Sequence, residues 1–373
     1  MGLQWNWERS QAVWIIVPFH QRYNLSILHH ILAKRLIRGS TMPLTLEDIA
    51  KISGVSRSTV SRVINGDVNV SDRTREKVQE IIRRYEFQPN LAARGLAAGV
   101  TNVIGLVIPR GVSAIFADPF FPLIIQGVTS ACNAMDYSVM LWLAEPEYER
   151  RTIHKILYSG LIDGVIVTSM LLEDPIIESM AASKLPFITI GRHPTNDRIS
   201  YVDVDNRQGA RNAVNHLLRG HRRRIATITG PGNMIAGQER VEGYYECLRE
   251  RNIPREPALV AEGDFTDAGG YYAMLQLLTA KPDAVFVASD SMAYGAMRAI
   301  QEAGLRIPHD IAVIGFDDIP QSAHVNPPLT TIRQPIHQIG ATAAETLIDM
   351  IAHQNDQQRR VILPTELVIR ASA

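Results

Sequence analysis

Residues 45–99 read TLEDIAKISGVSRSTVSRVINGDVNVSDRTREKVQEIIRRYEFQPNLAARGLAAG, and this stretch decides the fold of the N-terminal part of the chain. Apolar residues recur in it at intervals of three and four, the spacing that buries one face of a helix. The recurring residues are Leu46, Ile49 and Ala50, then Val60, Val63 and Ile64, then Val78, Ile81, Ile82 and Tyr85. The pattern predicts three short amphipathic helices.

Residues that favour helix starts stand before each predicted helix. Thr45 with Asp48 can form a capping box, Ser56 precedes the second helix, and Ser71 precedes the third. Gly54 supplies the tight bend between the first two helices. This arrangement predicts a helix-turn-helix unit, whose second helix enters the major groove of DNA.

The side chains of the second helix suit that placement. Arg57, Ser58 and Arg62 share one exposed face, where a guanidinium can grip guanine and a hydroxyl can bond base edges. The other candidate DNA contacts have short polar side chains that can hydrogen-bond to phosphate oxygens or lie near the base-reading face. They are Thr45, Ser56, Thr59, Ser61 and Asn65. Taken singly, each is an ordinary cap or surface residue; taken together, they favour DNA binding.

This stretch resembles the DNA-binding part of the lactose and galactose repressor (LacI/GalR) family of bacterial transcription regulators. The resemblance is carried by TLEDIAKISGVSRSTVSRVING, TREKV and QPNLAARGLA. It implies that residues 89–100 form a hinge helix on operator DNA, with Leu96 as a wedge in the minor groove, Ala93 beside it and Asn90 at the helix start. Gly95 and Gly99 weaken an isolated helix, so we expect folding on binding.

Charge and cysteine content constrain the partners. The chain has 38 basic and 38 acidic side chains, and residues 43–89 hold eight basic and seven acidic ones, so we expect useful DNA affinity to need a homodimer. Cys132 and Cys247 have neither disulfide nor zinc spacing. The sequence has no apolar run long enough to span a bilayer, so we expect no membrane partner and a cytoplasmic location. Because the chain is expected to bind DNA, we expect it at the bacterial nucleoid. We expect neither a metal nor a cofactor.

The sequence divides into four parts. We expect residues 1–42 to be a disordered extension or the product of a start assigned too early, although Lys34, Arg35 and Arg38 could instead form an arm on DNA. Residues 43–88 are the predicted helix-turn-helix domain, residues 89–100 the hinge, and residues 101–373 an effector-binding and dimerisation domain. Its first lobe is expected at about 101–204 and 335–355, and its second at about 206–332 and 360–373.

Short β-branched runs alternate with amphipathic stretches from Thr101 onward. The predicted strands are 103–108, 138–143, 164–168, 187–190, 224–229, 284–288 and 311–316, and the predicted helices include 120–135, 208–219, 238–251, 268–279 and 291–303. Such alternation predicts parallel sheets with right-handed crossovers. The expected fold is a small all-α helix-turn-helix domain followed by an α/β domain of two parallel-sheet lobes.

Ligands in parallel α/β sheets bind beyond the carboxyl ends of strands, so we looked for polar and aromatic residues there. This half is similar to the periplasmic-binding-protein-like effector domain of the same family, most densely in DPFFPLIIQGV, VDVDNRQGA and IPHDIAVIGFDD. The resemblance implies effector contacts at Asp118, Phe121, Arg192, Arg240, Phe265, Ser289 and Asp317. Considered one at a time, the phenylalanines could instead be core residues. Arg240, which we expect at the start of a helix, could instead form an ion pair with Glu239 or Glu242 on the helix surface.

These patterns predict a sequence-specific transcription regulator, a repressor, that binds double-stranded operator DNA as a homodimer under the control of a small polar effector, a sugar or sugar derivative. The expected pivots between lobes are 205–207, 317–319 and 331–335. Nucleotide-binding and nucleophile-elbow motifs are missing from the sequence, so we do not expect an enzyme. The alternative is a sugar-binding protein or sugar-processing enzyme with an incidental helical N-terminal domain.

Overall fold

The computed structural model describes residues 44–88, 100–109, 115, 118–143, 153, 155, 157–168, 171–172, 175–193, 198–353 and 357–373. It contains two compact units, which divide between Asn90 and Leu91. Within the described part of the chain, no helix is long and apolar enough to cross a membrane.

Within its described residues 44–88, the first unit contains three helices, α2 (Leu46–Ser53), α3 (Arg57–Ile64) and α4 (Asp72–Arg84), as predicted. Their apolar faces meet in one small core of Ile49, Ala50, Val60, Val63, Val70, Val78 and Phe87. Tyr85, expected in this core, is exposed because the chain leaves the helix there and Phe87 packs inward instead. Gly54 has a φ of 65°, which allows the sharp bend between α2 and α3.

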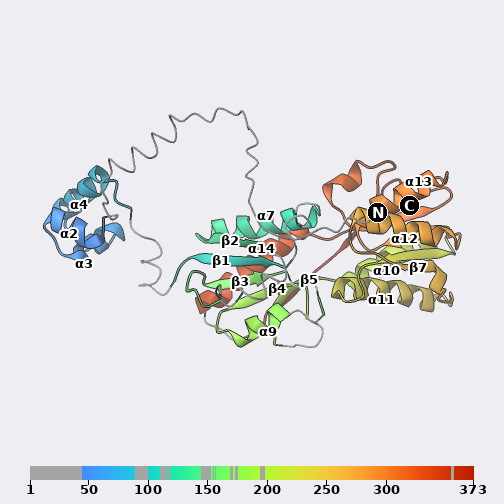
Figure 1. Cartoon of the computed structure of the whole chain (residues 1–373), viewed down its shortest axis with the longest axis horizontal. Helices are drawn as coiled ribbons and strands as arrows, with labels where there is room; N and C mark the ends of the chain where they lie inside the picture. The colour runs from blue at the N-terminus through green and yellow to red at the C-terminus, as the bar shows by residue number, and fades with distance from the viewer. Residues whose placement is uncertain are drawn as a thin grey trace, which may run out of the picture. The chain divides into compact units, whose positions relative to one another are not determined.

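The described residues of the second unit form two six-stranded sheets, and Figure 1 shows strands of this unit among its helices. The first has the order β11-β5-β4-β3-β1-β2, all parallel, and the second has the order β12-β10-β9-β8-β6-β7, parallel except at β12. The strands of the first sheet are β1 (Val103–Ile108), β2 (Ser138–Leu143), β3 (Gly164–Val167), β4 (Phe187–Ile190), β5 (Tyr201–Val204) and β11 (Arg360–Leu363). Those of the second are β6 (Ile225–Thr229), β7 (Val260–Glu262), β8 (Ala284–Val287), β9 (Ala312–Asp317), β10 (Thr330–Arg333) and β12 (Glu366–Val368).

Helices cover both faces of each sheet, which buries the nearly continuous apolar strands. On the first sheet, α7 (Phe120–Ala134) and α14 (Ile336–His353) pack on one face and α9 (Pro175–Ala182) packs on the other. On the second sheet, α12 (Asp267–Leu278) and α13 (Asp290–Glu302) lie opposite α10 (Asn206–Arg219) and α11 (Ile235–Glu250). Two short 3-10 helices, Pro257–Leu259 and Pro320–Ala323, complete the second lobe.

The chain crosses between the lobes three times: after β5 at residue 205, between β10 and α14 at residues 334–335, and between β11 and β12 at residues 364–365. Two of the expected pivots coincide with these crossings. The pivot expected at 317–319 is not a crossing, because β9 and β10 lie in the same sheet. Residues 360–363 were expected in the second lobe, but their backbone pairs with β5 of the first.

Candidate functional site

The surface of α3 carries the polar residues singled out in the first unit. Ser56 caps the helix by accepting a hydrogen bond from the backbone N–H of Thr59 (3.1 Å). Thr45 and Asp48 form a reciprocal capping box at α2, which confirms the predicted helix start. Ser71 precedes α4, but its side chain makes no capping hydrogen bond to the backbone. These caps fix the first turn of α3, where the candidate DNA contacts begin.

The structure leaves most of the α3 candidates open to solvent. Ser56, Arg57, Ser58, Arg62 and Asn65 are exposed, as is Thr45, whereas Thr59 and Ser61 are half-buried. Arg57 pairs with Glu47 (Nε to Oε1, 3.0 Å), and Arg62 lies 3.8 Å from Asp67. Asn90, Ala93 and Leu96 lie outside the described residues.

A cavity of about 540 Å³ opens within the second unit, between its two lobes. Six of the seven expected effector contacts line it: Asp118, Phe121, Arg240, Phe265, Ser289 and Asp317. Asp118 and Phe121 come from the first lobe, whereas the other four come from the second. The cavity therefore has walls from both lobes, as parallel sheets whose carboxyl ends face one cleft predict.

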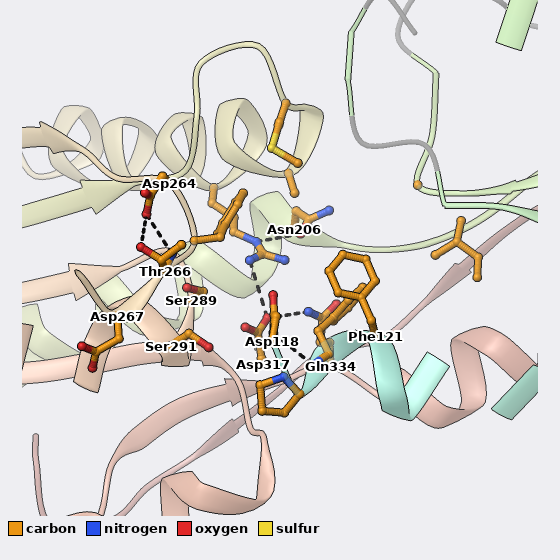
Figure 2. A pocket seen from close by; sticks show the side chains of 18 of the residues that line it. Asp118, Phe121, Asn206, Asp264, Thr266, Asp267, Ser289, Ser291, Asp317 and Gln334 are labelled. Carbon is orange, nitrogen blue, oxygen red and sulfur yellow. Dashed lines mark hydrogen bonds and ion pairs between the residues drawn. The ribbon is translucent and has the colours of Figure 1, made fainter. Parts of the chain in front are cut away.

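Asp317 and Arg240 form the buried centre of the cavity wall. Asp317 accepts a hydrogen bond from Gln334 Nε2 (2.5 Å), and its Oδ1 lies 3.7 Å from Arg240 Nη1. Arg240 also donates to Asn206 Oδ1 (2.9 Å), and its guanidinium lies over the ring of Phe316. Figure 2 shows Asp118, Asp317 and Gln334 close together.

Burial sets the electrostatics of this centre. It raises the pKa of the Asp317 carboxyl well above its usual range, although the nearby guanidinium of Arg240 opposes the rise. Asp290 and Asp118 also raise this pKa by repulsion between like charges. A polar ligand that offers hydroxyl groups could form hydrogen bonds with these buried groups.

Aromatic rings and hydroxyls occupy the rest of the wall. Phe121 is buried and meets Phe120 edge to face, with ring centroids 5.5 Å apart. Phe265 has a φ of 66° and packs over Gly230, where any Cβ would come within 2.2 Å of the ring. Ser289 is buried, and its hydroxyl oxygen accepts a hydrogen bond from the backbone N–H of Met292 at the start of α13 (3.2 Å).

Arg192, the seventh expected effector contact, is not among the residues that line the cavity, although Asp203, to which it donates, is. Its Nε donates to Asp203 (2.9 Å), its Nη2 to the Val204 carbonyl (3.1 Å), and its Nη1 lies 3.1 Å from Glu239. These acceptors draw the guanidinium onto β5 and α11. Arg240 also differs from expectation, because it lies in the second turn of α11 and not at its start.

Several polar residues that line the cavity were not anticipated, namely Asp203, Asn206, Asp264, Thr266, Asp267, Ser291, Gln321 and Gln334. Asp203 and Asn206 flank the end of β5, and Gln334 follows β10. Neither strand was predicted from the sequence, so these positions did not stand out as strand ends. Asp264 accepts two hydrogen bonds from Thr266 at the start of α12, an Asx-type turn that its sequence could have indicated.

Comparison with known proteins agrees with this architecture. The family model for "Bacterial regulatory proteins, lacI family" matches residues 45–90, and that for "Periplasmic binding protein-like domain" matches residues 214–373. The chain is 38% identical over 332 residues to the HTH-type transcriptional regulator CelR of Thermobifida fusca, covering 88% of this chain and 98% of that protein.

Two solved structures are similar along nearly the same span. A CelR–cellobiose complex has a TM-score of 0.71 at 36% identity, covering 88% of this chain and 100% of the other. A lac repressor dimer bound to operator and the anti-inducer ONPF has a TM-score of 0.80 at 31% identity, covering 89% and 99%. The chain belongs to the lacI family of bacterial regulatory proteins, which confirms the predicted family. The reading as a sugar-binding protein or enzyme with an incidental helical domain is therefore not favoured.

Proposed function

We propose that this chain is a transcription repressor whose binding to operator DNA is controlled by a sugar or sugar derivative held between its two lobes. The observation that carries the proposal is the cavity of about 540 Å³ with walls from both lobes. A ligand there touches both lobes at once, so its binding energy depends on their arrangement. Such a dependence is what an effector needs in order to shift a conformational equilibrium.

The chemistry of the cavity supports a sugar. Asp317 and Arg240 offer a carboxylate and a guanidinium on one wall, and Asn206 and Gln334 add amides. Hydroxyl groups of a sugar ring can donate to the carboxylate and accept from the others. Phe121 and Phe265 supply apolar surface for the faces of the ring. The similar CelR structure contains cellobiose, which makes cellobiose the first ligand to try.

The DNA-binding part of the proposal places α3 in the major groove. Arg57, Ser58 and Arg62 are the proposed base-reading residues, and Thr45, Ser56, Thr59, Ser61 and Asn65 the proposed supporting contacts. Residues 89–100, with Asn90, Ala93 and Leu96, are proposed to complete the contact in the minor groove. A symmetric dimer would match a near-palindromic operator, as the lac repressor dimer on operator supports.

We propose that the angle between the two lobes links effector binding to operator binding. The three chain crossings at 205, 334–335 and 364–365 are the places where a rotation between lobes can occur. In the dimer, this rotation would change the separation of the two hinge segments and hence operator affinity. We propose a cytoplasmic protein associated with the nucleoid and assign it no catalytic activity.

The test is fluorescence anisotropy of labelled DNA from beside the protein's own gene, titrated with the full chain. Cellobiose, lactose and ribose are compared at equal concentration. We expect tight binding to this DNA relative to scrambled DNA and at least a tenfold change in Kd with one sugar, equivalent to about 1.4 kcal/mol. Failure to prefer its own upstream DNA, or indifference to the whole sugar set, would contradict the proposal.

A further inference from the structure

Three hydrogen bonds within the first lobe hold Arg192. It follows β4, and both its backbone N–H and its Nε donate to Asp203 Oδ2 on β5 (3.2 and 2.9 Å). Its Nη2 donates to the carbonyl of Val204 (3.1 Å). These bonds fix the orientation of the guanidinium relative to the first sheet.

The remaining guanidinium nitrogen reaches the second lobe. Arg192 Nη1 lies 3.1 Å from Glu239 Oε1 on α11, and only 28% and 16% of the two side chains are exposed. Glu239 Oε2 is buried. Burial raises the pKa of Glu239, and the charge of Arg192 from the first lobe opposes that rise, helped by Asn206 and by the charge of Arg207 from its own lobe. Arg192 is the cation that lies within ion-pairing distance of this carboxylate, and it comes from the other lobe.

This ion pair is connected to the cavity through a short chain of hydrogen bonds. Glu239 precedes Arg240, whose Nε donates to Asn206 (2.9 Å). Asn206 Nδ2 in turn donates to Asp203 (3.3 Å), which holds Arg192. Asp203, Asn206 and Arg240 all line the cavity, and Asn206 directly follows the first chain crossing. A ligand that contacts these three residues acts on both ends of the ion pair.

We infer that Glu239 is a positioning residue that holds the second lobe against the first through Arg192, and that this ion pair maintains the lobe arrangement to which the effector binds. Its ligand-dependent part rests on the function proposed above. Glu239 does not itself line the cavity. Removing its charge therefore changes effector affinity through the lobe angle, not through a lost ligand contact.

The direct test measures the distance between lobes in the ligand-free full chain. Spin labels are placed at the exposed positions Glu178 of α9 and Arg249 of α11, diluted with unlabelled chain, and read by double electron–electron resonance. Glu239→Gln is expected to broaden the distance distribution and shift it from that of the parent. Glu242→Gln is the matched control, because it removes the same charge from the same helix but pairs with Arg207 within one lobe. It should leave the distribution unchanged.

Cellobiose titration by calorimetry gives the second readout. Glu239→Gln should weaken binding about fivefold and Glu242→Gln less than twofold, since only the first changes the lobe equilibrium. Glu239→Ala repeats both measurements, with circular dichroism confirming that each variant is folded. A Glu239→Gln distance distribution identical to the parent's overturns the inference whether or not any sugar binds. A parent chain that responds to no sugar overturns the proposed function instead, and the distance result still decides the role of the ion pair.

Discussion

Asp317 combines burial, charge and backbone strain at one residue. It is 7% exposed, and its φ of 128° lies where residues other than glycine are uncommon. Such a conformation costs about 1–3 kcal/mol and persists where neighbouring contacts determine it, here the bonds to Gln334 and the charge of Arg240. Strained, buried carboxylates are frequent at binding sites. The strain therefore supports Asp317 as an effector contact.

Asp290 gives a pH prediction of defined sign. It is fully buried, accepts bonds from Ser322, Thr331 and the Ile319 N–H, and burial raises its pKa to about 6. The native state thus binds this proton more tightly than the unfolded state, and the resulting stability is lost as pH rises from about 4 through about 6. Between these limits, the free energy of unfolding should fall by about 3 kcal/mol more in the parent than in Asp290→Asn.

Urea unfolding at a series of pH values measures this difference, with Asp310→Asn as control. Hydrogen bonds from Arg306 hold the pKa of Asp310 below its usual range, so the stability that this carboxylate contributes is lost only as the pH falls below about 4. The curves of the parent and Asp310→Asn should therefore run parallel between about pH 4 and 6 and diverge below that range. Parallel pH curves for the parent and Asp290→Asn would show that the buried carboxyl titrates normally.

Arg57 offers the most direct test of the proposed contacts between α3 and the bases of the operator. Its ion pair with Glu47 is largely solvated and contributes little stability, so the guanidinium is available to DNA. Arg57→Ala should lower operator affinity about 10- to 100-fold and relax base preference. Arg83→Ala removes the same charge from exposed α4 and should weaken all DNA slightly and equally. Competition anisotropy measures both, and identical losses in the two variants would argue against base contact by Arg57.

At the level of elements, close helix crossings hold the second lobe together. At Gly270 of α12, a Cβ would lie 2.0 Å from the carbonyl oxygen of Met292, and at Gly295 of α13 a Cβ would lie 1.9 Å from that of Asp267. Backbone contact of this kind leaves no room for a side chain on either helix. The two helices therefore pack with their backbones in contact, and α13 carries Ser289 and Asp290 at its start.

Gly270→Ala should destabilise the effector unit by about 1–3 kcal/mol, because the added methyl forces α12 and α13 apart. Gly220→Ala is the matched control, since a Cβ there meets nothing closer than 3.4 Å and the φ of −73° suits alanine. Urea unfolding monitored by circular dichroism compares them. Equal stability of the two variants would mean that the crossing can relax.

Strands with long apolar runs were predictable from sequence, and several short strands were not. The predicted strands at 103–108, 138–143 and 187–190 match β1, β2 and β4 in the structure. The four-residue strands β5 and β10 were missed, because a charged residue interrupts the short run YVDV and TTIR carries only one apolar residue. Their pairing comes from neighbours distant in sequence, which local patterns do not record.

At the scale of the whole effector unit, the site follows from strand order. Asp317 and Ser289 could be found because each follows a recognisable strand, whereas Asp203, Asn206 and Gln334 depend on the two missed strands. Arg192 follows β4 as predicted, but Asp203 and Glu239 bind its guanidinium, and it is not among the residues that line the cavity in this structure. Partners from elements far apart in sequence decide the orientation of such a side chain.

The claim that cavity occupancy controls DNA binding is tested most directly by operator anisotropy with the parent and Asp317→Ala side by side. Without sugar, the two should bind the operator with Kd values within about threefold of each other, because Asp317 is in the effector unit and not the helix-turn-helix unit. With the active sugar, the parent Kd should change at least tenfold, about 1.4 kcal/mol, and the variant Kd should not change. A full sugar response in Asp317→Ala would contradict the account.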